Sequence, residues 1–166
     1  MREIPKFHLR APEPTDADAI AEVQIVTWRA TYGHLLPSSH FDHNALEDRK
    51  AMWRLILSDR KLPQRLRVAE VGGSIIGFAH AGSPLDDDDP VRDLQLYTLY
   101  LLPEHHGSGA GQALLDAVLA GDQAQLWVAK DNPRAHSFYR RNGFVPDGSE
   151  KIDRGAADLV EVRLVR

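Results

Sequence analysis

Three glycines at alternate positions, between an apolar run and a helix-forming run, constrain this chain most. The apolar run spans residues 94–102 and ends at Pro103, which lacks the N–H that a sheet ladder needs. Residues 112–120 then combine helix-forming residues with an apolar face at i, i+3, i+4 spacing. The sequence therefore predicts a strand, a glycine turn over residues 107–111, and a helix whose N-terminus begins at that turn.

This arrangement favours an anion site. The first turn of a helix exposes unpaired N–H groups and the positive end of the helix dipole. Gly107, Gly109 and Gly111 lack the Cβ that would keep an anion away from the backbone. Phosphate is the expected ligand. A plain flexible turn is the alternative, because the glycine spacing matches neither a P-loop nor a dinucleotide fingerprint.

The rest of the chain alternates between helical and extended patterns, with no repeat and no linker. Periodicity and turn residues predict helices over 17–31, 46–57 and 133–142, and strands over 7–11, 65–71, 74–81, 125–129, from 144, and 158–165. Gly72 and Gly73 are expected to close a hairpin. The four aspartates at 86–89 predict a solvated connection, or else a segment that attracts a cationic acceptor.

Two sequence blocks resemble the GNAT superfamily of N-acetyltransferases. The pattern L-x-L-x-P-x-x-H-x-x-G-x-G over residues 99–111 is similar to its acyl-CoA motif, and N-x-x-A-x-x-F-Y-x-x-x-G-F over 132–144 is similar to the helix that follows. The blocks come in the family's order. The resemblance implies one α/β (α+β) GNAT domain over residues 1–166. Its mixed, mostly antiparallel sheet would have six to seven strands and about four helices, with strands splayed at the cofactor site.

The implied reaction is transfer of an acetyl group from acetyl-CoA, the co-substrate, to a primary amine. With no cysteine in the chain, direct transfer in a ternary complex is expected rather than an acyl-cysteine route. Two alternatives stay open: a GNAT-fold sensor that binds acyl-CoA without turnover, and a GNAT with a longer acyl donor. Gln95 favours the sensor, because many relatives have glutamate there, whereas Tyr139 favours the enzyme.

By the same resemblance, a set of backbone and side-chain groups would hold the cofactor. The expected cofactor-binding residues are Leu99, Leu101, His106, Gly107, Ser108, Gly109, Ala110, Gly111, Asn132 and Tyr139. His106 replaces the usual arginine or glutamine, and a neutral imidazole supplies one donor and no charge. Acetyl-CoA is therefore expected to bind more tightly at about pH 6 than at about pH 8. Asn132 could instead be a plain helix cap before Pro133.

Tyr139 is the expected general acid. A thiol of pKa about 8.5 leaves more readily when it is protonated, and a phenol of pKa about 10 holds a proton near neutral pH. A core tyrosine is the alternative. The amine must also lose a proton, and Gln95 cannot accept it. His80 is the candidate base because its ordinary pKa suits the task, and a structural histidine is the alternative.

The acceptor site is expected on the first helix. Residues 27–37 resemble the S-W-x-x-x-Y-x-x-x-x-P segment of one bacterial GNAT subgroup. Trp28 and Tyr32 share a helix face and could stack on a cation, or they could be plain core aromatics. The expected substrate-binding residues are Trp28, Tyr32 and Gln95.

The composition and charge of the chain argue against several classes of binding partner. A net charge of −4 argues against nucleic acid. No apolar run approaches the roughly 18 residues of a membrane span, and the first residues lack a signal core, so we expect a cytoplasmic protein with no membrane contact. No metal is expected, because the group at residues 40–43 has no further ligands at suitable spacing. The expected partner is a small-molecule or peptide amine, and a homodimer stays open.

Overall fold

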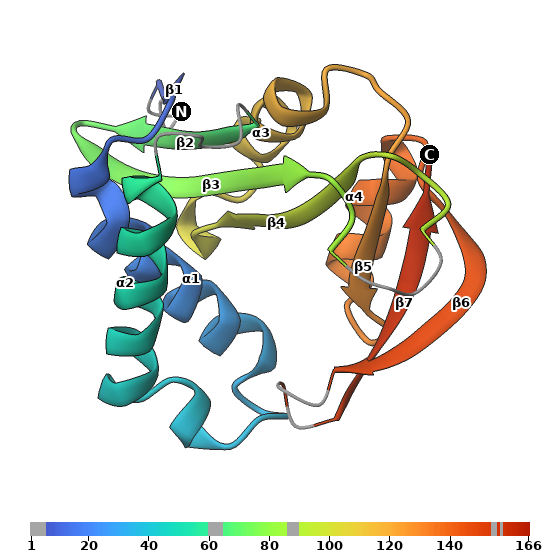
Figure 1. The fold of residues 1–166 in the computed structure, drawn as a ribbon, viewed down its shortest axis with the longest axis horizontal. Coiled ribbons are helices and arrows are strands. Elements are labelled where there is room, and N and C mark those ends of the chain that lie inside the picture. Colours follow the sequence, from blue (N-terminus) through green and yellow to red (C-terminus); the bar gives the residue numbers. More distant parts are fainter. Residues whose placement is uncertain (1–5, 60–64, 86–89, 154–155, 157) are drawn as a thin grey trace.

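The computed structural model describes residues 6–59, 65–85, 90–153, 156 and 158–166 (Figure 1). The strands are β1 (His8–Arg10), β2 (Leu66–Val71), β3 (Ser74–Gly82), β4 (Gln95–Leu101), β5 (Gln125–Ala129), β6 (Val145–Asp153) and β7 (Leu159–Val165). The helices are α1 (Ala17–Tyr32), α2 (His43–Ser58), α3 (Ala110–Leu119) and α4 (Pro133–Arg141), with short 3₁₀ turns η1 (Pro14–Asp16), η2 (Ser38–His40) and η3 (Pro103–His105).

The strands form one seven-stranded sheet in the order β1-β2-β3-β4-β5-β7-β6. Every neighbouring pair is antiparallel except β4 and β5, which are parallel. Helices α1 and α2 lie on one side of the sheet and α3 on the other (Figure 1). The predicted mixed, mostly antiparallel sheet with four helices is confirmed.

Strands β4 and β5 pair only at their first residues and then part. The register joins Gln95 to Gln125 and Leu96 to Leu126. The almost fully buried Gln125 side chain stabilises this point, the vertex of the two strands. Its amide nitrogen donates to the Gln95 side-chain oxygen at 3.1 Å, and its side-chain oxygen accepts from the Val91 N–H at 2.9 Å. Beyond the vertex, one edge of β4 has no strand partner among the described residues.

The helix boundaries follow from local signals. Helix α2 begins three residues before the expected position because the Asp42 carboxylate caps it, accepting from the Ala45 N–H at 2.9 Å. Helix α3 begins directly after Gly109, whose φ of 87° is left-handed and therefore suits glycine. In the described parts of the chain, no helix is both long and apolar enough to cross a membrane.

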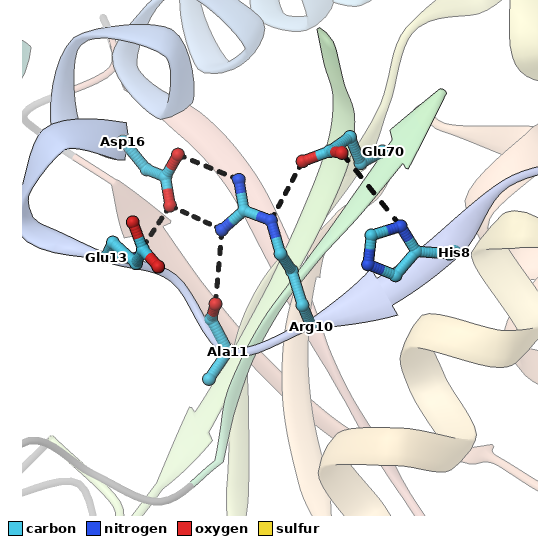
Figure 2. Close-up of polar contacts among 6 residues, drawn as sticks. All are labelled: His8, Arg10, Ala11, Glu13, Asp16 and Glu70. Atoms are coloured by element: carbon cyan, nitrogen blue, oxygen red, sulfur yellow. Dashed lines mark hydrogen bonds and ion pairs between the residues drawn. The ribbon is translucent and has the colours of Figure 1, made fainter. Parts of the chain in front are cut away.

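A polar network ties the first strand to the start of α1 (Figure 2). The Arg10 guanidinium donates to both oxygens of Asp16, at 2.6 and 2.9 Å, and to Glu70 of β2 at 2.8 Å. Asp16 also accepts from the Glu13 N–H at 2.7 Å. The hydrogen bond from Arg10 holds the pKa of Asp16 below its usual range. The network therefore anchors one end of α1, whose other end carries Trp28 and Tyr32.

We expect Asp16→Asn to lower the free energy of unfolding by about 1–2 kcal/mol near neutral pH. Because the pKa of Asp16 is lowered in the folded state, its stabilisation is complete above the ordinary pKa of about 4 and disappears as the pH falls through the folded value. Urea unfolding near pH 7 and near pH 3 should therefore show a difference between variant and parent that shrinks in acid. Asp18→Asn, which breaks an exposed pair with Arg54, is the matched control. An equal loss at both pH values would contradict this account.

Candidate active site

A cavity of about 510 Å³ opens where β4 and β5 part. Its walls come from α1, β4, the glycine turn, β5, α4 and β7. Ten of the expected site residues line it: Trp28, Tyr32, Leu99, Leu101, His106, Gly107, Gly109, Gly111, Asn132 and Tyr139. A larger cavity, of about 730 Å³, lies around Arg65, Asp93 and Asp122 and contains none of the expected site residues. The site therefore belongs to the smaller cavity.

The three alternate glycines open into this cavity. Gly107 and Gly109 have φ values of 81° and 87°, and a Cβ built at either would meet no heavy atom within 4 Å. Among the described residues, the N–H groups of Gly107, Gly109 and Gly111 have no hydrogen-bond partner. The turn therefore presents unsatisfied donors to open space, as an anion site requires.

The two residues between the glycines behave differently from the expectation. The Ser108 N–H donates to the His105 carbonyl at 3.2 Å, and the Ala110 N–H donates to the Ser108 hydroxyl at 3.2 Å. Neither Ser108 nor Ala110 lines the cavity. The structure therefore brings three of the five turn residues to the site, because the other two use their N–H groups to hold the turn.

Basic side chains next to the turn were missed by the sequence reasoning. Arg134 and Arg141 of α4 line the cavity, and the charge of Arg134 reaches His106. Both arginines lie within the second family-like block, so their positions in that block were the available signal. Together with the glycine turn, Arg134 gives this end of the cavity a positive character.

The His106 ring is held by the strand that precedes it. Its Nε2 lies 3.0 Å from the Leu101 carbonyl oxygen, which only accepts, so Nε2 carries the proton. Burial lowers the pKa of His106, and the positive charge of Arg134 lowers it further. The imidazole is therefore neutral over a wider pH range than the sequence suggested.

We therefore expect the His106-dependent change in acetyl-CoA affinity between about pH 5 and pH 8 to lie at lower pH than an ordinary histidine would place it. A histidine with a lowered pKa takes up its proton only in more acidic solution, so tighter binding should begin there. Calorimetric titration of the parent and of His106→Gln across this range checks the prediction. A rise in affinity centred at or above the ordinary histidine pKa of about 6.5 that disappears in the variant would refute it.

Tyr139 is buried in the cavity wall with only 8% of its surface exposed. Burial raises its pKa, and the neighbouring phenols of Tyr100 and Tyr32 raise it further. The phenol therefore keeps its proton at any physiological pH. Four tyrosines line the cavity, Tyr32 of α1, Tyr97 and Tyr100 of β4, and Tyr139 of α4, and the sequence reasoning missed Tyr97 and Tyr100.

Asn132 serves two roles in the structure. Its side-chain oxygen accepts from the Ala135 N–H at 3.2 Å and caps α4, as one reading of the sequence predicted. Its amide nitrogen donates to the Tyr32 hydroxyl at 3.3 Å. Asn132 therefore links the start of α4 to the end of α1 across the cavity.

His80 and Gln95 lie away from the cavity lining. The His80 ring packs against Tyr97, with ring centroids 4.9 Å apart, and against Trp53 at 6.1 Å. Burial lowers its pKa to about 4, which matches poorly with a base that works near neutral pH. Gln95 is buried at the vertex of the strands, so the structure brings neither residue to the reacting centre.

Other expected features lie outside the site. The aspartates at 86–89 fall outside the described residues. Within the described residues, no group of three or more metal-ligating side chains gathers. Asp42 was a candidate metal ligand together with His40 and His43, but its carboxylate caps α2.

The comparisons with known proteins agree with this geometry. Residues 63–146 match a family model described as an acetyltransferase (GNAT) domain. An uncharacterized N-acetyltransferase, Rv2669 of Mycobacterium tuberculosis, is 34% identical over 163 residues, covering 92% of this chain and 97% of that protein. The uncharacterized N-acetyltransferase YuaI of Bacillus subtilis is 29% identical over 131 residues, covering 75% of this chain and 73% of that protein.

Solved structures share the fold. The PaiA N-acetyltransferase of Thermoplasma acidophilum, solved in complex with coenzyme A, superimposes with a TM-score of 0.67 at 20% identity, covering 95% of this chain and 98% of that one. PH1933 of Pyrococcus horikoshii has a TM-score of 0.71 at 18% identity, covering 97% of this chain and 98% of that one.

Proposed function

This chain belongs to the GNAT family of acetyltransferases, and we propose that it transfers an acetyl group from acetyl-CoA to a primary amine by direct transfer in a ternary complex. One observation carries the proposal: the unsatisfied glycine N–H groups and the protonated phenol of Tyr139 open into the same cavity. We further propose that residues 1–166 act as one catalytic domain.

The residues present fit the proposed co-substrate. The open space at Gly107 and Gly109 gives a diphosphate room to approach the backbone, and Arg134 adds positive charge beside it. The unpaired edge of β4 at Leu99 and Leu101 offers backbone groups to an extended arm, as an added strand would use them. The structure of PaiA with coenzyme A supports this assignment by analogy of fold.

Tyr139 supplies the proton in the proposed reaction. The acceptor nitrogen forms a bond to the carbonyl carbon, the carbon–sulfur bond breaks, and the phenol of Tyr139 gives its proton to the sulfur. The proton lost by the nitrogen returns to the phenolate or leaves to solvent. General acid catalysis of this kind is worth about 10²–10⁴ in rate.

Thiol release tests the proposal directly. Mixing the protein with acetyl-CoA and a panel of primary amines should release coenzyme A at a rate that depends on the amine. Binding of acetyl-CoA without any amine-dependent release would instead support a sensor. Faster release from longer acyl-CoA thioesters would assign another acyl donor to the same site.

A further inference from the structure

The charges that line the cavity separate by sign. Among the described residues of its lining, Glu161 carries the only carboxylate. The basic members, Arg134 and Arg141, lie on α4, and Arg134 is close enough to His106 to lower its pKa. One end of the cavity therefore suits an anion, and Glu161 marks a separate position that suits a cation.

Glu161 lies on the part of β7 that faces the end of α1. It pairs with Ala129 of β5, and Ala129 packs in one cluster with Tyr32. The Glu161 side chain is 20% exposed, so it is partly shielded from water but still accessible. Its Oε2 lies 4.0 Å from the Lys151 ammonium of β6, which is outside the cavity lining.

Aromatic rings surround the position that Glu161 faces. Trp28 and Tyr32 of α1 are in edge contact, with ring centroids 5.1 Å apart, and the Trp28 indole N–H donates to the Tyr100 hydroxyl at 2.7 Å. Burial raises the pKa of Tyr32 and Tyr100, and the negative charge of Glu161 raises both further, so the carboxylate lies near both phenols. The Arg49 guanidinium of α2 already lies over the Trp28 ring, 5.7 Å from its centroid. The Tyr32 ring beside the carboxylate is therefore the aromatic face that an ammonium group would use.

We infer that Glu161 binds the ammonium group of the acceptor, and that the acceptors are primary amines with no carboxylate next to the nitrogen. The inference rests on the proposed transferase function and names the substrate class of that site. A second carboxylate beside the ammonium would be repelled by Glu161. Of the basic residues of the lining, Arg134 lies near His106 beside the glycine turn, where the proposed diphosphate uses its charge.

Two matched pairs of amines test this selectivity, because the members of each pair differ by one carboxylate. Tyramine is compared with tyrosine, and phenethylamine with phenylalanine, in calorimetric binding to the protein loaded with coenzyme A and in steady-state kinetics with acetyl-CoA. We expect the decarboxylated amine to be preferred by about 10-fold or more. Glu161→Gln should raise the KM for tyramine by about 10- to 100-fold with little change in kcat, and should bring the preference ratio towards one.

Glu150→Gln is the matched control. Glu150 lies on β6, its carboxylate pairs with the Lys130 ammonium at 2.6 Å, and it is outside the cavity lining. This variant should keep the parental KM and preference ratio, and all three proteins should bind acetyl-CoA equally. If Glu161→Gln does not fold, the preference of the parent protein between the amines with and without a carboxylate still tests the inferred substrate class.

Three results would overturn the inference: an unchanged tyramine affinity in folded Glu161→Gln, a parental preference for tyrosine and phenylalanine, or no binding of tyramine or phenethylamine to the parent. Failure of the proposed transferase function would give a different result from these three. Tyramine would then bind in a Glu161-dependent way while no amine releases thiol from acetyl-CoA, which would support the ammonium site and remove the transferase.

Discussion

Replacing Tyr139 by phenylalanine is expected to lower kcat by about 10²- to 10⁴-fold while acetyl-CoA binds as tightly as in the parent. The substitution removes only the phenolic O–H, the group proposed to protonate the departing sulfur. The ring itself stays, so its contacts with Phe138 and Phe144, at centroid distances of 5.2 and 5.7 Å, are kept. Thiol release under saturating substrates measures kcat, and calorimetry measures the dissociation constant of acetyl-CoA.

Tyr97→Phe is the control for loss of a tyrosine hydroxyl. The Tyr97 ring lines the cavity, but its hydroxyl donates to the carbonyl oxygen of Ser83, which is outside the lining. Its kcat should stay close to that of the parent. A Tyr139→Phe variant with parental kcat would exclude Tyr139 as the general acid and leave the proton to come from solvent.

Gly109→Val is expected to weaken acetyl-CoA binding by about 10- to 100-fold, which corresponds to losing one or two hydrogen bonds to a charged group. Valine is disfavoured at the left-handed φ of 87° that Gly109 adopts, and its side chain would enter the space from which an anion approaches the N–H groups. Calorimetric titration with acetyl-CoA gives the dissociation constant.

Gly121→Val separates the loss of the anion site from backbone strain. Gly121 follows the other end of α3, has a φ of 79°, and also has no heavy atom within 4 Å of a built Cβ. Both variants should lose about 1–3 kcal/mol of stability through the same strain, but only Gly109→Val should lose affinity. Equal affinities in the two variants would show that the turn does not bind the diphosphate.

Most of the fold could be predicted from the sequence because its helices and strands have clear local signals. The hairpin at Gly72 and Gly73, the helix start at Pro133 and the turn at Gly143 all lie at the expected positions. The point where β4 and β5 part was harder to predict from the sequence, because the hydrogen bond between Gln95 and Gln125 joins residues that are distant in sequence. No local pattern distinguishes a glutamine that holds two strands together from one that faces a substrate.

The candidate site was predictable where its groups belong to a contiguous motif. The glycine turn, Asn132 and Tyr139 line one cavity as the family-like blocks suggested. Glu161 could not be found in this way, because its place depends on the pairing of β7 with β5 rather than on its sequence neighbours. His80 was expected at the site from its side-chain chemistry alone, and strand register placed it against Trp53 instead.

The parting of β4 from β5 has an evolutionary consequence. The groups proposed to hold and protonate the thioester lie on β4, at the start of α3 and on α4, whereas the carboxylate proposed to select the amine lies on β7. Substitutions along residues 145–165 could therefore diversify which metabolite is modified while the donor machinery is inherited unaltered. Among the described residues, β7 reaches the cavity only through Leu159 and Glu161, so such changes can leave the glycine turn and Tyr139 in place.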